Sequence, residues 1–138
     1  MPIRRYTNKF KMKVNKIHHI AIICSDYERS KKFYVETLGF GIIQETYRAE
    51  RNSYKLDLQV GDSQIELFSF PNPPQRVNSP EACGLRHLAF TVENIEATVL
   101  YLKSQNIEVE NIRIDEITDK KFVFFKDPDG LPLELYQY

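Results

Sequence analysis

Residues 17–21 read Ile-His-His-Ile-Ala, and a similar stretch returns 68 positions later as Leu-Arg-His-Leu-Ala at residues 85–89. The same shift, with no gap, places Gln64-Ile65-Glu66-Leu67-Phe68 on Pro132-Leu133-Glu134-Leu135-Tyr136. It also places one turn, Gly61-Asp62, on another, Asp129-Gly130. Segments that match at a fixed period indicate an internal duplication. We therefore expect two similar modules.

The first module reads as a strand, a helix and three further strands. Residues 17–24 form an apolar strand, and Ser25 with Glu28 three positions later has the pattern of a capping box that opens a helix. Gly39 tolerates positive φ and is expected to end that helix. Strands are predicted at 41–49, 53–60 and 63–69. The residues expected on the buried face of the helix are Tyr27, Ser30, Phe33, Tyr34, Thr37 and Leu38.

The second module repeats this order. A strand is predicted at 85–92, then a helix capped by Asn94, then strands at 107–114, 121–126 and 132–137. The residues expected on the buried face of this helix are Ile95, Thr98, Val99 and Leu102. The predicted fold class is α+β, built from two tandem βαβββ modules.

The chain divides by composition into four segments. Residues 1–15 form a basic extension, residues 16–70 the first module, residues 71–84 a proline-rich linker and residues 85–138 the second module. Residues 1–16 carry six basic residues and no acid, so the remainder has a net charge of −6. A basic arm can bind nucleic acid, but an acidic body is a poor platform for a polyanion. We expect a solvated extension and no nucleic-acid partner.

Length and composition restrict the remaining classes. A chain of 138 residues suits a single domain. It has no apolar run near the roughly 20 residues that a membrane helix needs, and no signal-peptide pattern. Cys24 and Cys83 are isolated, which argues against a disulfide scaffold or a metal knuckle. We expect a cytoplasmic protein without membrane contact.

Four residues stand out in the duplication: His19, Glu66, His87 and Glu134. Each histidine lies 47 positions before its glutamate, and each glutamate interrupts an aliphatic strand. A single histidine in such a strand is more often a packed core residue, and a single glutamate usually reaches solvent. A carboxylate within an apolar strand costs several kcal/mol unless it is paired or bound to metal. Matching positions in both halves favour a metal site.

Two imidazoles and two carboxylates form a donor set suited to a divalent transition metal. Zn and Ni are the favoured occupants, and Mn, Co and Fe also fit this donor set. Open coordination positions would let the metal bind a carbonyl or hydroxyl of a small-molecule substrate.

The chain resembles the vicinal oxygen chelate superfamily of glyoxalase, bleomycin-resistance and dioxygenase proteins. The resemblance rests on residues 16–22 (Lys-Ile-His-His-Ile-Ala-Ile), 65–67, 84–90, 127–130 and 133–135, with Phe33-Tyr34 and Leu38-Gly39-Phe40. It implies that both modules curl into a cleft around one divalent metal. In glyoxalase I (lactoylglutathione lyase) the metal ligands occupy the positions of His19, Glu66, His87 and Glu134.

The resemblance further implies a glyoxalase I-like bacterial lyase or isomerase. Its substrate would be the hemithioacetal of a 2-oxoaldehyde, such as methylglyoxal, with glutathione or another thiol, and the reaction would pass through an enediolate. Glu134 matches the favoured catalytic base, with Glu66 as its counterpart across the site. Arg48, Arg51, Lys120 and Lys121 either hold an acidic substrate or are solvated charges at strand edges.

Other functions of the superfamily compete with this one. Methylmalonyl-CoA epimerase uses similar α-proton chemistry, and extradiol dioxygenases use two histidines and one glutamate with Fe(II). Bleomycin-resistance proteins bind a drug without metal, and they typically lack the four ligands. The two modules could close a site within one chain or across a two-fold axis, and the resemblance to bacterial glyoxalase I favours a homodimer.

Overall fold

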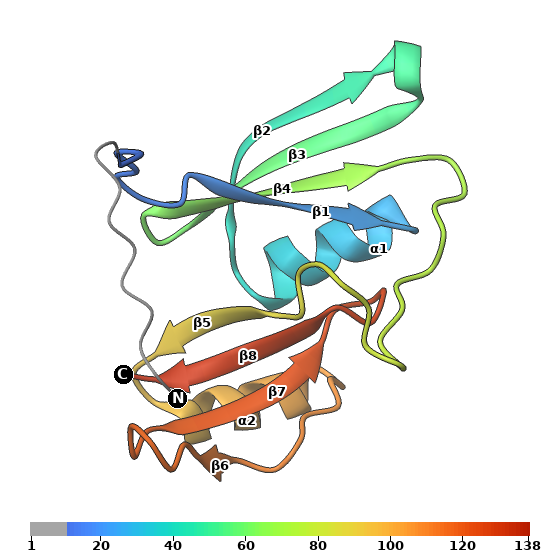
Figure 1. Cartoon of the computed structure of the whole chain (residues 1–138). Helices are drawn as coiled ribbons and strands as arrows, with labels where there is room; N and C mark the ends of the chain where they lie inside the picture. Colours follow the sequence, from blue (N-terminus) through green and yellow to red (C-terminus); the bar gives the residue numbers. More distant parts are fainter. Residues whose placement is uncertain (1–10) are drawn as a thin grey trace.

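The computed structural model describes residues 11–138, which form two four-stranded sheets and two main helices (Figure 1). The first sheet has the order β1-β4-β3-β2 and the second the order β5-β8-β7-β6. Most of the basic extension, residues 1–10, lies outside the described residues. The strands are β1 (His19–Cys24), β2 (Gly41–Arg48), β3 (Ser53–Val60), β4 (Ser63–Ser69), β5 (Leu88–Val92), β6 (Arg113–Ile114), β7 (Lys121–Lys126) and β8 (Pro132–Gln137).

The helices follow the first strand of each module. Helix α1 (Tyr27–Lys32) continues as a π-helical turn (Phe33–Thr37), and α2 (Ile95–Ser104) follows β5. A short 3₁₀ turn (Ala49–Arg51) joins β2 to β3. None of the helices within residues 11–138 is long and apolar enough to cross a membrane.

The two sheets repeat the same topology, which confirms the predicted α+β fold with two βαβββ modules. In each sheet the first strand runs parallel to the last, β1 beside β4 and β5 beside β8. The other pairings are antiparallel. Because a parallel pair needs a long crossover, the helix and two strands of each module lie between its members in sequence.

Asp26, rather than the predicted Ser25, caps α1. The Asp26 side chain accepts from the Arg29 N–H at 3.2 Å. Ser25 is occupied elsewhere, because its backbone N–H and its hydroxyl both donate to the Asp129 carboxylate in the second module. The predictions for Asn94, which accepts from the Ala97 N–H, and for Gly39, which has φ of +81°, are confirmed.

The predicted strand at 107–114 was too long. Only Arg113–Ile114 pairs continuously with β7, and Val109 forms an isolated bridge to Phe125. The predicted strand at 85–92 begins at Leu88 instead. The carbonyl oxygens of Leu85 and Arg86 accept hydrogen bonds from the Arg76 guanidinium. These two acceptors are therefore paired with a side chain and not with a neighbouring strand.

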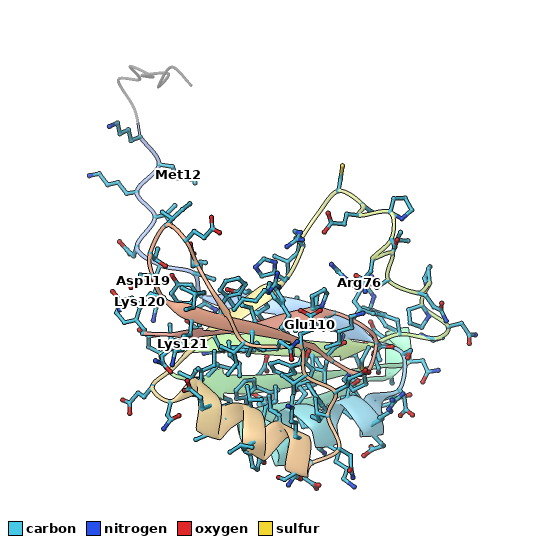
Figure 2. All side chains as sticks on the ribbon, turned by 90° about the horizontal axis from the view of Figure 1, so that it is seen from below. Met12, Arg76, Glu110, Asp119, Lys120 and Lys121 are labelled. Carbon is cyan, nitrogen blue, oxygen red and sulfur yellow. The ribbon has the colours of Figure 1, made fainter. Side chains whose placement is uncertain are left out.

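Both helices cover the same side of the two sheets, and the opposite side is open (Figure 2). The loop that carries Asp119 and Lys120 rises from the open side, as does the segment that carries Arg76. Core residues of both modules form one hydrophobic cluster, in which Phe33 packs near Phe125 and Phe40 near Phe90. The modules therefore share a core beneath an open sheet face.

Candidate functional site

The first His–Glu pair lies on the open face of the first sheet. Along β1, Ile22 and Cys24 are buried, whereas His19, Ala21 and Ile23 are exposed. The β1–β4 register places Ala21 beside Glu66. This small neighbour leaves room for the carboxylate, and Oε2 of Glu66 lies 3.1 Å from Nε2 of His19.

The second pair has the same construction. The β5–β8 register places Ala89 beside Glu134, and Oε2 of Glu134 lies 3.2 Å from Nε2 of His87. Leu133 and Leu135, on either side of Glu134, are buried on the helix side. In both pairs the carboxylate is the more covered partner, with side-chain exposures of 12% for Glu66 and 13% for Glu134 against 41% for His19 and 28% for His87.

The surroundings of the two glutamates differ. Glu66 pairs in register with Asp57 on β3, and Nζ of Lys55 lies 3.5 Å from its Oε1. Glu134 instead pairs in register with Phe124 on β7, whose ring packs edge-on against His87 with a centroid distance of 5.1 Å. The first carboxylate therefore lies among charges and the second beside an aromatic ring.

The chain brings the four candidate ligands together as two pairs, not as one cluster. Within residues 11–138 there is no group of three or more His, Cys, Asp or Glu side chains that could hold a metal ion. A four-ligand centre closed within one chain therefore has no support in this structure. Each pair nevertheless presents one imidazole nitrogen and carboxylate oxygens on an open face, and these are the donor types that divalent transition metals take.

Arg76 fixes the backbone that leads into His87. Its Nη2 donates to the carbonyl oxygens of Leu85 and Arg86, both at 2.8 Å, and its Nε donates to Oδ1 of Asn78 at 2.7 Å. Asn78 in turn donates to the Gly130 carbonyl at 2.7 Å. His87 lies just before β5 begins, so Arg76 holds a segment that the strand ladder does not.

Sequence reasoning missed Lys55, Arg76 and Phe124. The alternation along 53–60 does place Lys55 on the polar face of its strand, but its contact with Glu66 depends on the register between β3 and β4. Phe124 approaches His87 only because β7 lies beside β8. The contacts of Arg76 with Leu85 and Arg86 depend on how the linker folds back.

The cations expected either to hold a substrate or to be solvated have varied surroundings. Arg48 donates to the Ser53 hydroxyl and lies over the rings of Phe68 and Phe70, at 4.9 and 5.6 Å from their centroids. Lys121 pairs with Glu96 at 2.5 Å. Lys120 lies 5.5 Å from the centroid of the Tyr138 ring.

Comparison with protein families agrees with the fold. Residues 16–135 match the family model of the Glyoxalase/Bleomycin resistance protein/Dioxygenase superfamily. The chain belongs to this superfamily. Within the superfamily it is 63% identical to the uncharacterised protein YwkD of Bacillus subtilis (strain 168), over 91% of this chain and 99% of YwkD. It is 57% identical to the uncharacterised protein YaeR of Escherichia coli (strain K12), over 90% of this chain and 97% of YaeR.

A solved structure supports the same fold. The crystal structure of SMU.1112c is similar with a TM-score of 0.87 and 50% identity, covering 90% of this chain and 99% of that chain. More distant relatives have named activities. The metallothiol transferase FosB of Staphylococcus epidermidis (strain ATCC 12228 / FDA PCI 1200) is 28% identical, over 91% of this chain and 83% of FosB. The lactoylglutathione lyase of Schizosaccharomyces pombe (strain 972 / ATCC 24843) is 26% identical, over 90% of this chain and 48% of the lyase.

Proposed function

We propose that this protein is a divalent-metal-dependent lyase of the glyoxalase I type that acts on the hemithioacetal of a 2-oxoaldehyde and a thiol. The observation that supports this most strongly is the repeated His–Glu pair, built at equivalent places in both sheets. His19, Glu66, His87 and Glu134 would hold the metal, with Zn or Ni favoured and Mn, Co or Fe as further occupants. Glutathione or another thiol would supply the sulfur of the substrate.

The proposal includes a homodimer, because one chain holds the ligands as two separate pairs. In a two-fold dimer, the first pair of one subunit would face the second pair of its partner, and two equivalent four-ligand sites would form. Both pairs lie on the open side of their sheets. A partner subunit can therefore approach them without disturbing the shared core.

The divalent cation would supply Lewis-acid chemistry, polarising the oxygens of the substrate so that the neighbouring C–H proton becomes more acidic. Glu134 would accept that proton at a carboxylate oxygen and return a proton to the adjacent carbon. The asymmetry of the pairs favours this assignment over Glu66. Oε1 of Glu66 is already in ion-pair contact with Lys55, whereas His87 is the single ion-pair partner of Glu134 within residues 11–138.

The function is tested by metal reconstitution of the full chain. Metal-free protein is loaded separately with Zn, Ni, Mn, Co or Fe(II), and thioester formation from methylglyoxal is followed with glutathione, cysteine and coenzyme A as thiols. We expect metal-dependent thioester formation with at least one pairing of metal and thiol. If the protein binds metal but forms no thioester with any of these metals and thiols, the lyase proposal is wrong. Methylmalonyl-CoA epimerase activity then becomes the next to assay.

The shared site is tested by mixing two inactive variants. The double variant His19→Ala/Glu66→Ala lacks the first pair, and His87→Ala/Glu134→Ala lacks the second. After co-refolding, a heterodimer with sites across the two-fold axis regains one intact site of its two, which predicts about one quarter of the wild-type metal content and activity. If every mixture stays without high-affinity metal, the ligands do not combine across subunits.

A further inference from the structure

A groove of about 850 Å³ lies beside the second His–Glu pair. Its walls are the linker from Arg76 to Arg86 and the segment from Gln105 to Arg113. Its floor is β7, from Phe124 to Lys126, and it reaches Arg29 and Lys32 of α1. Figure 2 shows two labelled residues of these walls, Arg76 and Glu110. The volume is in the range of pockets that hold small organic molecules.

The groove is richer in cations than the rest of the body. Its lining contains six basic and four acidic residues, whereas residues 17–138 carry a net charge of −6. One of the four acids is committed elsewhere, because the buried Asp127 accepts a hydrogen bond from Tyr34. Two others form exposed ion pairs, Glu81 with Arg86 and Glu110 with Arg113, and such pairs hold their partners weakly.

The remaining cations of the groove are available to a ligand. Within residues 11–138, no carboxylate lies within 4.0 Å of the charged groups of Arg29, Lys32, Arg76 or Lys126. Arg76 makes three hydrogen bonds to the linker, and Lys126 is exposed on the floor. Arginine and lysine in one groove match the charge and geometry of carboxylate and phosphate groups.

The groove contacts the candidate site through Phe124 and through Arg86, whose Nη1 lies 3.3 Å from Nδ1 of His87. Phe124 contributes to the floor and packs edge-on against His87. Arg113 lies over the rings of Phe122 and Phe124, at 4.9 and 5.7 Å from their centroids, so its guanidinium is held at the end of the groove next to this pair. A molecule whose reacting carbon lay at His87 and Glu134 would extend over Phe124 into the groove.

From this arrangement we propose that the groove binds an acidic group of the substrate, and that the substrate therefore carries a carboxylate, phosphate or phosphonate remote from its reacting carbon. The inference rests on the proposed function for its link to catalysis. The anion-binding groove itself requires no metal and no turnover. Arg113 and Lys126 are the recognition residues chosen for substitution. Replacing them leaves in place the hydrogen bonds from Arg76 that support the backbone.

The test uses metal-free full-length protein at low ionic strength, titrated with inorganic phosphate, with malonate and with the neutral analogue malonamide. Binding is followed by calorimetry and by ¹H–¹⁵N chemical shifts. We expect saturable binding of malonate, of phosphate or of both, with shifts confined to residues 76–86, 105–113 and 124–126 and to Arg29 and Lys32 of α1. Because the contacts are charged, affinity should fall as salt is added. Malonamide should not bind.

Two variants and a matched control make the result specific. We expect Lys126→Met and Arg113→Met each to weaken anion binding at least threefold, and the double variant to weaken it at least tenfold. Lys103→Met, which removes an exposed cation from α2, should leave binding unchanged. Absence of saturable anion binding, equal affinities in all variants, or equal binding of malonamide would each overturn the inference.

The same measurements distinguish a carboxylate ligand from a phosphate ligand, and they distinguish failure of this inference from failure of the proposed function. Tighter malonate binding assigns the groove to a carboxylate, and tighter phosphate binding assigns it to a phosphate or phosphonate. If the lyase assay fails while anion binding persists, the proposed function is wrong and the groove remains. If turnover is found, Lys126→Met should raise KM for the glutathione adduct and not for the uncharged 2-mercaptoethanol adduct. Equal changes in KM for the two adducts would show that the groove does not recognise the substrate.

Discussion

The phenol of Tyr34 in the first module donates a 2.7 Å hydrogen bond to the carboxylate of Asp127 in the second, across 93 positions of sequence. Both residues are buried. The other carboxylate oxygen of Asp127 accepts from the backbone N–H groups of Asp129 and Leu131. This contact joins the π-helical turn after α1 to the turn between β7 and β8, so it fixes how the two modules share their core.

Removing the phenol should destabilise the whole chain. Tyr34→Phe leaves a buried charged acceptor without its donor, which we expect to lower the free energy of unfolding by about 1.5–3 kcal/mol. The measurement is urea denaturation at pH 7. Tyr101→Phe is the control: its hydroxyl also crosses between modules, to the Thr37 carbonyl, but at an exposed site, so we expect a loss of under about 1 kcal/mol. Equal losses in the two variants would contradict the role of burial.

Through Asp127, the stability of the folded protein should depend on pH with a sign opposite to that given by most carboxylates. Burial raises the pKa of Asp127 above its ordinary value of 3.8, and the hydrogen bonds from Tyr34 and the backbone only partly oppose this. The folded chain therefore holds this proton more tightly than the unfolded chain. The stability that protonation contributes is complete below pH 3.8 and is lost as the pH rises through the raised value.

Asp127→Asn removes this titration and can still bond to the phenol and to the backbone N–H groups. We expect the free energy of unfolding of the wild type, measured relative to Asp127→Asn, to fall as the pH is raised from 3.8 upward. Urea denaturation at a series of pH values gives both curves. A difference that stays flat, or that grows with pH, would show that burial does not control this group.

The two glutamates of the candidate site should respond differently to substitution. Glu134→Gln should reduce turnover by about 10²–10⁴-fold, the size of a general-base contribution, while retaining much of the bound metal. Glu66→Gln should affect metal content at least as much as turnover, because Lys55 already compensates part of its charge. Metal content by elemental analysis, measured beside kcat, separates the two effects. Undiminished turnover in Glu134→Gln would refute its assignment as the base.

Arg76 should influence the metal without contacting it. Arg76→Met removes the donors to the Leu85 and Arg86 carbonyls that support His87. Outer-shell partners of metal ligands are worth about 10–100-fold in metal affinity, and we expect a weakening of that size by competitive chelation. Lys103→Met should leave metal affinity unchanged. If Arg76→Met binds metal as the wild type does, the backbone at 85–86 holds its place without the guanidinium.

The two cysteines should differ sharply in reactivity. Cys24 is buried and its thiol donates to the Phe68 carbonyl at 3.3 Å, and burial raises its pKa to about 11. Because the thiolate is the reactive form, Cys24 should resist alkylation at pH 8 in the folded protein. Cys83 is exposed in the linker and should react quickly. Mass spectrometry after iodoacetamide should therefore find one label in native protein and two in urea, and two labels in native protein would contradict this.

The sequence by itself determined the duplication, the fold class and the choice of the four candidate residues. The 68-residue repeat and the 47-residue spacing were sufficient for this, because both halves carry the same residue types at matching positions. Most strand boundaries followed from hydrophobic alternation. Three boundaries failed. The first strand begins at His19 and not at residue 17. The other two, at 85–87 and 107–112, lie where hydrogen bonds to Arg76 or an isolated bridge replace a strand ladder, and hydrophobic alternation does not reveal either kind of contact.

Only the tertiary structure decided that one chain presents the ligands as two pairs, and that their surroundings differ. Lys55 beside Glu66 and Phe124 beside His87 come from neighbouring strands, through registers that are set by how the sheets pack. Asp26 rather than Ser25 caps α1 because Asp129, more than 100 positions away, binds Ser25. Contacts of this kind depend on distances in space, and a pattern read along the chain contains only separations in sequence.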